Sequence, residues 1–259
     1  MMRCALKVLA LIAGLAGTPA MSAEQLITSL SNHRVMVTSS FIGAELVLFG
    51  AIDDPRPEVV ARRGYDVVVT VRGPRMSART RRKERVLGIW VNTESRLFVN
   101  APAYLAVLSN KPVEQIASTD VLRREQVGLN SYLLPQQIGP DIGDVVRDDP
   151  FRGAFVRLRS EQGLYRQEAA GVTFLSPTLF RATIELPAEV TIGNYAVEVK
   201  LFANGQQVAR NNSALEVVKV GFEQFVANAA QHHGIWYGLG TAAMALLTGW
   251  FASVVFRRD

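Results

Sequence analysis

The chain has 259 residues, of which 49% are hydrophobic, and its 28 basic and 23 acidic side chains give a formal net charge of +5. Four of the basic residues and one acidic residue lie in the two terminal segments, so 24 basic side chains stand against 22 acidic ones in the central part. This near balance argues against a general nucleic-acid-binding protein.

The first 23 residues have the pattern of a secretory signal peptide. Two basic residues precede an apolar core at residues 8–17, which is too short to span a bilayer, and small residues follow at 18–23. We expect cleavage after Ala23, with cleavage after Ala20 or an uncleaved signal anchor as alternatives. Cys4, the one cysteine, lies ahead of the apolar core. The mature chain is therefore expected to lack disulfides, thiolate catalysis and cysteine metal sites.

The segment 24–112 is rich in β-branched and apolar residues that occur in short runs. We predict strands at both sides of Gly43 within residues 35–53, and then at 65–72, 85–92, 96–100 and 104–109. Prolines and glycines separate these runs. Six short strands at close spacing are typical of an antiparallel sandwich.

The segment 113–166 changes to helical spacing. Ser118 and Thr119 provide capping residues for a first helix, residues 135–143 predict a loop, and Asp149 followed by Pro150 starts a second helix that reaches Leu164.

Strands return in the segment 167–220. We predict them at residues 171–175, 179–186, 195–202, 206–210 and 214–220, with Asn204-Gly205 as a strong hairpin signal. The fold class expected is mainly β, with immunoglobulin-like β-sandwich modules at 24–112 and 167–220, the helical segment between them, and one C-terminal transmembrane helix. One larger sandwich with the helices as an insertion is the alternative.

The segment 221–259 begins with an amphipathic juxtamembrane pattern and continues into residues 235–256, which contain no charged side chain. Twenty-two helical residues extend about 33 Å, enough to cross a hydrocarbon core of about 30 Å. Basic residues at both chain ends belong on the cytoplasmic side. We therefore expect a single-pass membrane protein with its body exported and its C-terminus in the cytoplasm.

Several stretches together carry a family resemblance: SSFIGAELVLFGAID, RRKERVLGIWVN, PAYLAVLSNKP, LFRATIELPAEV, GNYAVEV and KVGFEQF. From about Val35 to the C-terminus the chain resembles the alphaproteobacterial putative transmembrane protein family. The resemblance implies a bacterial inner-membrane protein with a periplasmic domain and no assigned catalytic residues. It also implies gene neighbourhoods that contain sulfite or sulfonate exporters of the permease type. An accessory role in anion transport is the function that this would suggest.

The most distinctive polar feature is a basic run that contains a single acidic residue, Glu84. Its seven basic members are Arg72, Arg75, Arg79, Arg81, Arg82, Lys83 and Arg85. Guanidinium groups bind oxyanions and anionic lipid headgroups, so an anion or lipid contact is one interpretation. A solvated hairpin loop is the other, and blocks of like charge are often of that kind.

The remaining polar residues indicate no catalytic site. His232 and His233 are adjacent, so on a helix they point in different directions and cannot form a metal site alone. The pairs Asp53-Asp54 and Asp148-Asp149 each adjoin a proline, as turn and cap residues do. With no phosphate loop, dinucleotide fingerprint or HExxH motif, we expect no enzyme activity, no cofactor and no metal.

Small residues recur every fourth position on two stripes of the span, at Gly234, Gly238 and Ala242 and at Ala245, Gly249 and Ser253. This spacing permits close helix packing, although small residues are common in any span. The leading functional hypothesis is a membrane-anchored accessory protein that engages another membrane protein, such as an anion exporter. The alternative is a periplasmic anion-binding or sensing domain that uses the basic run. Partner, ligand and oligomeric state are left open by the sequence.

Overall fold

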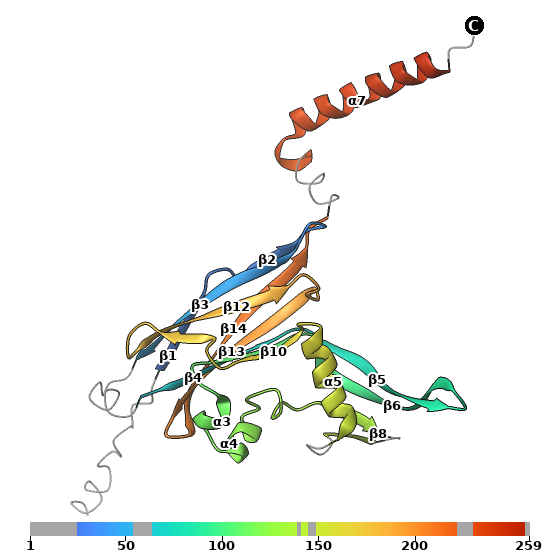
Figure 1. Ribbon diagram of the computed structural model, residues 1–259. Coiled ribbons are helices and arrows are strands. Elements are labelled where there is room, and N and C mark those ends of the chain that lie inside the picture. The colour runs from blue at the N-terminus through green and yellow to red at the C-terminus, as the bar shows by residue number, and fades with distance from the viewer. Residues whose placement is uncertain (1–24, 54–63, 139–140, 145–148, 222–229, 257–259) are drawn as a thin grey trace, which may run out of the picture.

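The computed structural model describes residues 25–53, 64–138, 141–144, 149–221 and 230–256 (Figure 1). The expected signal peptide and the expected juxtamembrane helix at 222–229 lie outside the described residues. The described strands form three sheets.

Six strands form the largest sheet, in the order β10 (Tyr165–Glu168), β7 (Leu105–Ser109), β4 (Asp66–Arg72), β13 (Gly193–Ala203), β14 (Gln206–Lys219) and β2 (Arg34–Val37). Its three inner pairs are antiparallel. Its two edge pairs, β10 with β7 and β14 with β2, are parallel and depart from the expected antiparallel arrangement. Asn204 and Gly205 close the predicted β13–β14 hairpin, both with positive φ, as a tight two-residue turn requires.

Four antiparallel strands form the second sheet, in the order β1 (Gln25–Leu30), β3 (Gly43–Asp53), β12 (Leu179–Pro187) and β11 (Val172–Phe174). The two sheets enclose the main core. Alternate side chains of each strand point into it, among them Leu46, Leu48, Val67, Val69, Val71, Phe180, Ile184, Val197 and Val199. Each fully buried aliphatic or aromatic side chain contributes about 1.5–3 kcal/mol, so this layer dominates the stability of the fold.

The pairing corrects the division into two β modules. β3 from the first predicted module pairs with β12 from the second, from Ala51 with Leu179 to Gly43 with Pro187. β4 and β13 likewise pair across the same division. The alternative arrangement, one sandwich with an insertion, therefore describes the fold. Local patterns show which residues form strands, but they carry no information on which distant strand completes a sheet.

The inserted segment is less helical than expected. It contains the short helices α3 (Val113–Ile116) and α4 (Thr119–Arg124), and the longer α5 (Pro150–Glu161), together with the strands β8 (Pro135–Ile138) and β9 (Asp141–Asp144). The last two replace the loop predicted at residues 135–143. The start of α5 is confirmed, because the Asp149 carboxylate accepts a hydrogen bond from the Arg152 backbone N–H at 3.1 Å.

The third sheet joins β8 and β9 to a long hairpin of β5 (Arg75–Val86) and β6 (Ile89–Pro102). Two strands predicted at 85–92 and 96–100 are parts of this hairpin. α5 packs on its base, where the rings of Phe98 and Phe155 stack with centroids 4.3 Å apart. The hairpin extends away from the rest of the β structure (Figure 1).

The C-terminal helix α7 (Gly234–Val255) confirms the predicted span. It is the one described helix that is long and apolar enough to cross a membrane. None of its side chains is buried by the rest of the described chain. Its apolar surface is therefore available to lipid or to another helix.

Candidate interaction site

The basic run lies in strands and not in the loop that the sequence suggested. Arg72 ends β4, and the other six residues belong to β5. Because the outer part of the β5–β6 hairpin is exposed on both faces, it shows no apolar alternation that would reveal a strand. We call residues 79–96, beyond the contact of β6 with β8, the arm.

The structure does not bring the seven basic side chains together on one surface. Arg72 lies on the six-stranded sheet, where its guanidinium is 3.1 Å from the Glu198 carboxylate. Arg82 forms an ion pair with Glu84 at 2.8 Å. Arg81 and Arg82 line a groove at the base of the arm, whereas Arg72 lines a separate cavity. Anion binding by all seven residues together is not favoured by this arrangement.

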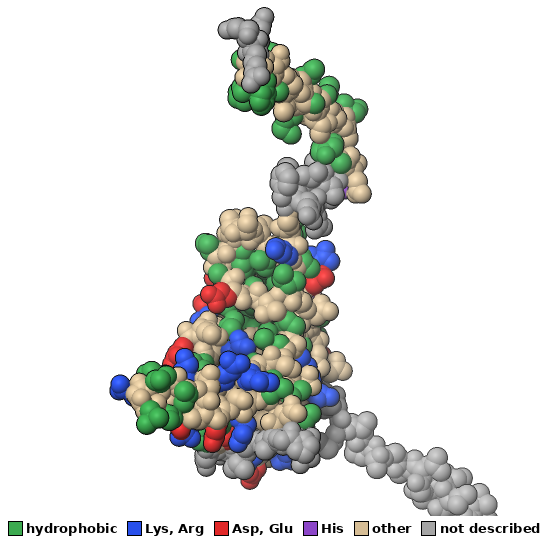
Figure 2. Space-filling model, turned by 90° about the vertical axis from the view of Figure 1, so that its right-hand side faces the viewer, with side chains coloured by type: hydrophobic (Ala, Val, Ile, Leu, Met, Phe, Trp, Pro, Cys, Tyr) green, Lys and Arg blue, Asp and Glu red, His purple; other side chains and the backbone are tan. Residues whose placement is uncertain are grey.

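The tip of the arm exposes a run of apolar side chains that sequence reasoning assigned to an ordinary strand. The exposed fractions are Val86 47%, Leu87 98%, Ile89 68%, Trp90 66% and Val91 39%. Isolated exposed apolar residues are normal, but a contiguous group of this kind marks an interaction surface. Figure 2 views the molecule from the side toward which the arm points and shows apolar and basic side chains gathered on its lower part.

The turn at the tip holds a leucine in an unfavourable backbone conformation. Leu87 has φ +50° and Gly88 has φ +86°, so both central residues occupy the left-handed region. Glycine adopts this region readily, but a leucine there costs on the order of 1–3 kcal/mol. The Arg85 side chain donates a hydrogen bond to the Gly88 carbonyl at 3.3 Å and helps to hold the turn. Leu87 is thereby directed into solvent at the end of the arm.

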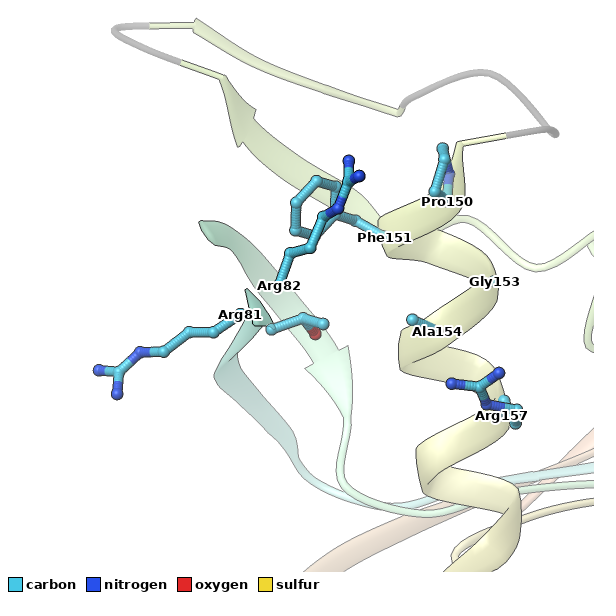
Figure 3. A pocket seen from close by; sticks show the side chains of 8 residues that line it. Arg81, Arg82, Pro150, Phe151, Gly153, Ala154 and Arg157 are labelled. Carbon is cyan, nitrogen blue, oxygen red and sulfur yellow. The ribbon is translucent and has the colours of Figure 1, made fainter. Parts of the chain in front are cut away.

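A groove of about 500 Å³ lies between the first residues of the arm and α5, beside the packed contact of Phe98 with Phe155. It is lined by Thr80, Arg81, Arg82, Pro150, Phe151, Gly153, Ala154 and Arg157. Figure 3 shows Arg81 pointing away from α5, while Arg157 comes from the helix itself. The Arg96 guanidinium lies 5.0 Å from the centre of the Phe151 ring, a cation–π contact that joins arm and helix.

The outer edge of the arm is open to pairing. Within the described residues β5 pairs with β6 alone, and β6 meets β8 only at Leu97 and Phe98. The backbone N–H and C=O groups along the outer edge of β5 therefore have no strand partner there. An exposed edge can accept an additional strand from another protein.

The structure does not bring the other candidate residues of the sequence together into a site within the described part of the chain. The described residues hold no group of three or more His, Cys, Asp or Glu side chains arranged for a metal. Asp53 ends β3 and Asp149 caps α5, while Asp54 and Asp148 lie outside the described residues. A Cβ added at Gly238 or Gly249 would meet nothing within 4 Å among the described atoms, so helix packing through the two small-residue stripes stays a prediction.

A model of the family described as "Putative transmembrane protein (Alph_Pro_TM)" matches residues 25–258. The chain belongs to this family. Because the match runs through the β structure and α7, both parts are features of the family, and the protein is anchored to a membrane by a single described span. The family description names no enzymatic activity. No protein with a curated description is significantly similar to the chain.

Proposed function

We propose that this Alph_Pro_TM protein is a membrane-anchored accessory module of the bacterial periplasm, and that its arm docks on an acidic surface of another membrane protein. The observation that carries the proposal is the apolar tip, at which Leu87 is 98% exposed and Trp90 66% exposed. Burial of such side chains by a partner would gain about 25 cal/mol per Å² of apolar surface. Tryptophan is also among the residues that most often dominate binding energy at interfaces.

The charge of the arm indicates what kind of partner fits it. Residues 79–96 contain six basic and two acidic side chains. Two copies of this edge would repel each other, which disfavours pairing of the arm with itself. An acidic partner surface would complement the arm and speed the encounter through electrostatic attraction.

A two-stranded ribbon offers both of the elements that such a contact needs. Its tip supplies an apolar anchor, and the open edge of β5 supplies backbone donors and acceptors for a strand of the partner. An isolated two-stranded ribbon is marginally stable in water. A partner that adds a strand to the arm would therefore stabilise it as well as bind it.

The membrane anchor supports the choice of a membrane protein as partner. Because α7 confines the protein to the membrane, the effective concentration of a partner in the same membrane is high. An interface of modest affinity is then enough for binding. The signal-peptide pattern and the basic residues at both chain ends support an inner-membrane protein with a periplasmic body. An anion exporter is the partner that the family resemblance suggests.

Affinity purification of the full-length protein from native membranes in a mild detergent tests this proposal. The wild type is expected to retain a specific membrane protein. The double variant Leu87→Ser, Trp90→Ser should lose it, since removal of an interface anchor costs about 2 kcal/mol or more. Ile42→Ser is the matched control, because Ile42 is 93% exposed but lies outside the arm. Retention of the same partner by the double variant, or its loss in the control, would contradict the proposal.

A further inference from the structure

The outer face of the six-stranded sheet carries a polar cavity that is distinct from the arm. The inner side chains of β4 and β13 fill the sandwich core, so the alternate side chains point outward. At one end of this outer face Val68, Val107 and Phe202 are covered by α3 and α4. Beside this covered region the outward side chains become polar.

The strand register places these polar side chains next to one another. Glu198 of β13 lies opposite Thr70 of β4 and opposite Asn212 of β14. Lys200 lies opposite Arg210 on the β14 side. They line a cavity of about 350 Å³ together with Arg72, Arg124, Glu125, Gln126 and Tyr132. The floor is therefore built from three paired strands, and one wall from the end of α4.

Two charged groups of the floor are buried and hold each other in place. Lys200 is 6% exposed and Glu198 is 8% exposed. The ammonium of Lys200 donates a hydrogen bond to the Glu125 carbonyl at the end of α4, and it lies 3.8 Å from the Glu198 carboxylate. Glu198 also contacts Arg72 at 3.1 Å. Burial lowers the pKa of Lys200, because desolvation disfavours the charged ammonium.

The cavity has more donor capacity than its own residues use. The Nε atom of Arg72 is buried and has no hydrogen-bond partner among the described atoms. Buried guanidinium donors are normally satisfied, so this one calls for a partner, such as a water molecule or an ion. The guanidinium groups of Arg124 and Arg210 form no ion pair with any described residue.

We infer that this cavity is a binding site for a compact oxyanion. Four basic side chains line it, Arg72, Arg124, Lys200 and Arg210, against the two carboxylates of Glu125 and Glu198. The lining thus has a formal excess of two positive charges. A ligand with two negative charges, such as sulfate or inorganic phosphate, would balance this excess.

The position of the donors indicates how such an anion would be held. The guanidinium group of Arg72 and the ammonium of Lys200 would contact it from the floor, and Arg124 and Arg210 would contact it from the mouth. Guanidinium groups suit this task because their fork of donors matches two oxygens of one anion. The volume of about 350 Å³ lies at the low end of small-molecule sites and is ample for such an anion.

Calorimetric titration of the full-length protein in detergent micelles with sulfate, and separately with inorganic phosphate, tests the inference. Chloride at matched ionic strength controls for general screening. Arg210→Gln and Arg124→Gln remove exposed side chains that have no role in the fold described above. Each should weaken binding by about tenfold or more, since a hydrogen bond to a charged group contributes about 1.5–3 kcal/mol. Arg181→Gln is the matched control, because Arg181 is exposed on β12 in the other sheet.

The expected result is binding of at least one of the two anions by the wild type and by Arg181→Gln, with a loss in the two cavity variants. The Leu87→Ser, Trp90→Ser protein should keep this binding, which separates the cavity from the docking of the arm. Absence of binding at millimolar sulfate and phosphate would overturn the inference. Equal affinities for wild type, Arg210→Gln and Arg124→Gln would also overturn it.

Discussion

Gly50 and Phe180 form a contact whose energy can be tested, and which joins two halves of the sequence. Gly50 of β3 pairs with Phe180 of β12. A Cβ atom added at Gly50 would lie 2.1 Å from Cζ of Phe180 and 2.6 Å from its Cε1 and Cε2 atoms. These distances are far below any ordinary contact, so Gly50→Ala must displace a ring that is fully buried in the core.

The expected magnitudes follow from this geometry. Gly50→Ala should lower the free energy of unfolding by about 1–3 kcal/mol, as overpacking of a close-packed core does. Phe180→Ala should lower it by about 3–5 kcal/mol, because it removes a buried ring and leaves a cavity. In the double variant the methyl group enters the space that the ring has left. The destabilisation caused by the added methyl group then largely disappears. The change in unfolding free energy of the double variant should therefore be about 1–3 kcal/mol smaller than the sum of the two single changes.

Urea unfolding of the full-length protein in detergent, followed by far-ultraviolet circular dichroism, measures the cycle. Gly153→Ala is the control, because a Cβ there meets nothing within 4 Å and the residue lies in the exposed part of α5. It should leave the stability unchanged or raise it by up to about 1 kcal/mol. Additive effects of Gly50→Ala and Phe180→Ala within about 0.5 kcal/mol would refute the contact, and with it the single sandwich.

Three further predictions concern pH, capping and the span. Burial raises the pKa of Tyr195 from 10.0 to about 12, so the free energy of unfolding should be fully retained below about pH 10 and fall between pH 10 and 12. In urea unfolding at each pH, Tyr195→Phe should show a shallower fall, and an unchanged fall would contradict this. Asp149→Ala should cost about 1 kcal/mol by the same unfolding measurement, whereas Asp149→Asn should cost less, because it keeps a capping oxygen. Gly238→Leu with Gly249→Leu should weaken self-association or partner association in a membrane association assay, and unchanged association in both would show that the stripe is not an interface.

The strand positions were largely predictable, because alternation and turn chemistry are local. Residues 195–202 alternate between apolar and polar side chains over most of their length, and Asn204-Gly205 closes the hairpin. Strands β13 and β14 follow this pattern. The capped start of α5 and the uncharged span of α7 are equally local signals. The immunoglobulin-like assignment stays a prediction. The arrangement of strands was not predictable, because β3 and β12 are joined by hydrogen bonds between residues more than 100 positions apart.

For the candidate sites, too, local features could be predicted and features that depend on distant strands could not. The basic run was visible in the sequence, but the position of six of its seven basic residues in one strand of an exposed ribbon was hidden by the charges on both faces of that strand. The apolar residues 86–91 (VLGIWV) beside that run are the signal for the tip, although their pattern alone predicts an ordinary strand. The polar cavity could not be found in this way, because Arg72, Lys200 and Arg210 meet only through the pairing of three strands.

Site-specific photocrosslinking in native membranes tests the central claim most directly. A photoreactive amino acid replaces Leu87 at the tip of the arm, and in a parallel variant it replaces Ile42, which is equally exposed elsewhere. The account predicts a specific adduct between Leu87 and another membrane protein, which mass spectrometry identifies, and no such adduct from Ile42. Adducts with lipid alone, no adduct from Leu87, or the same adducts from both positions would contradict it.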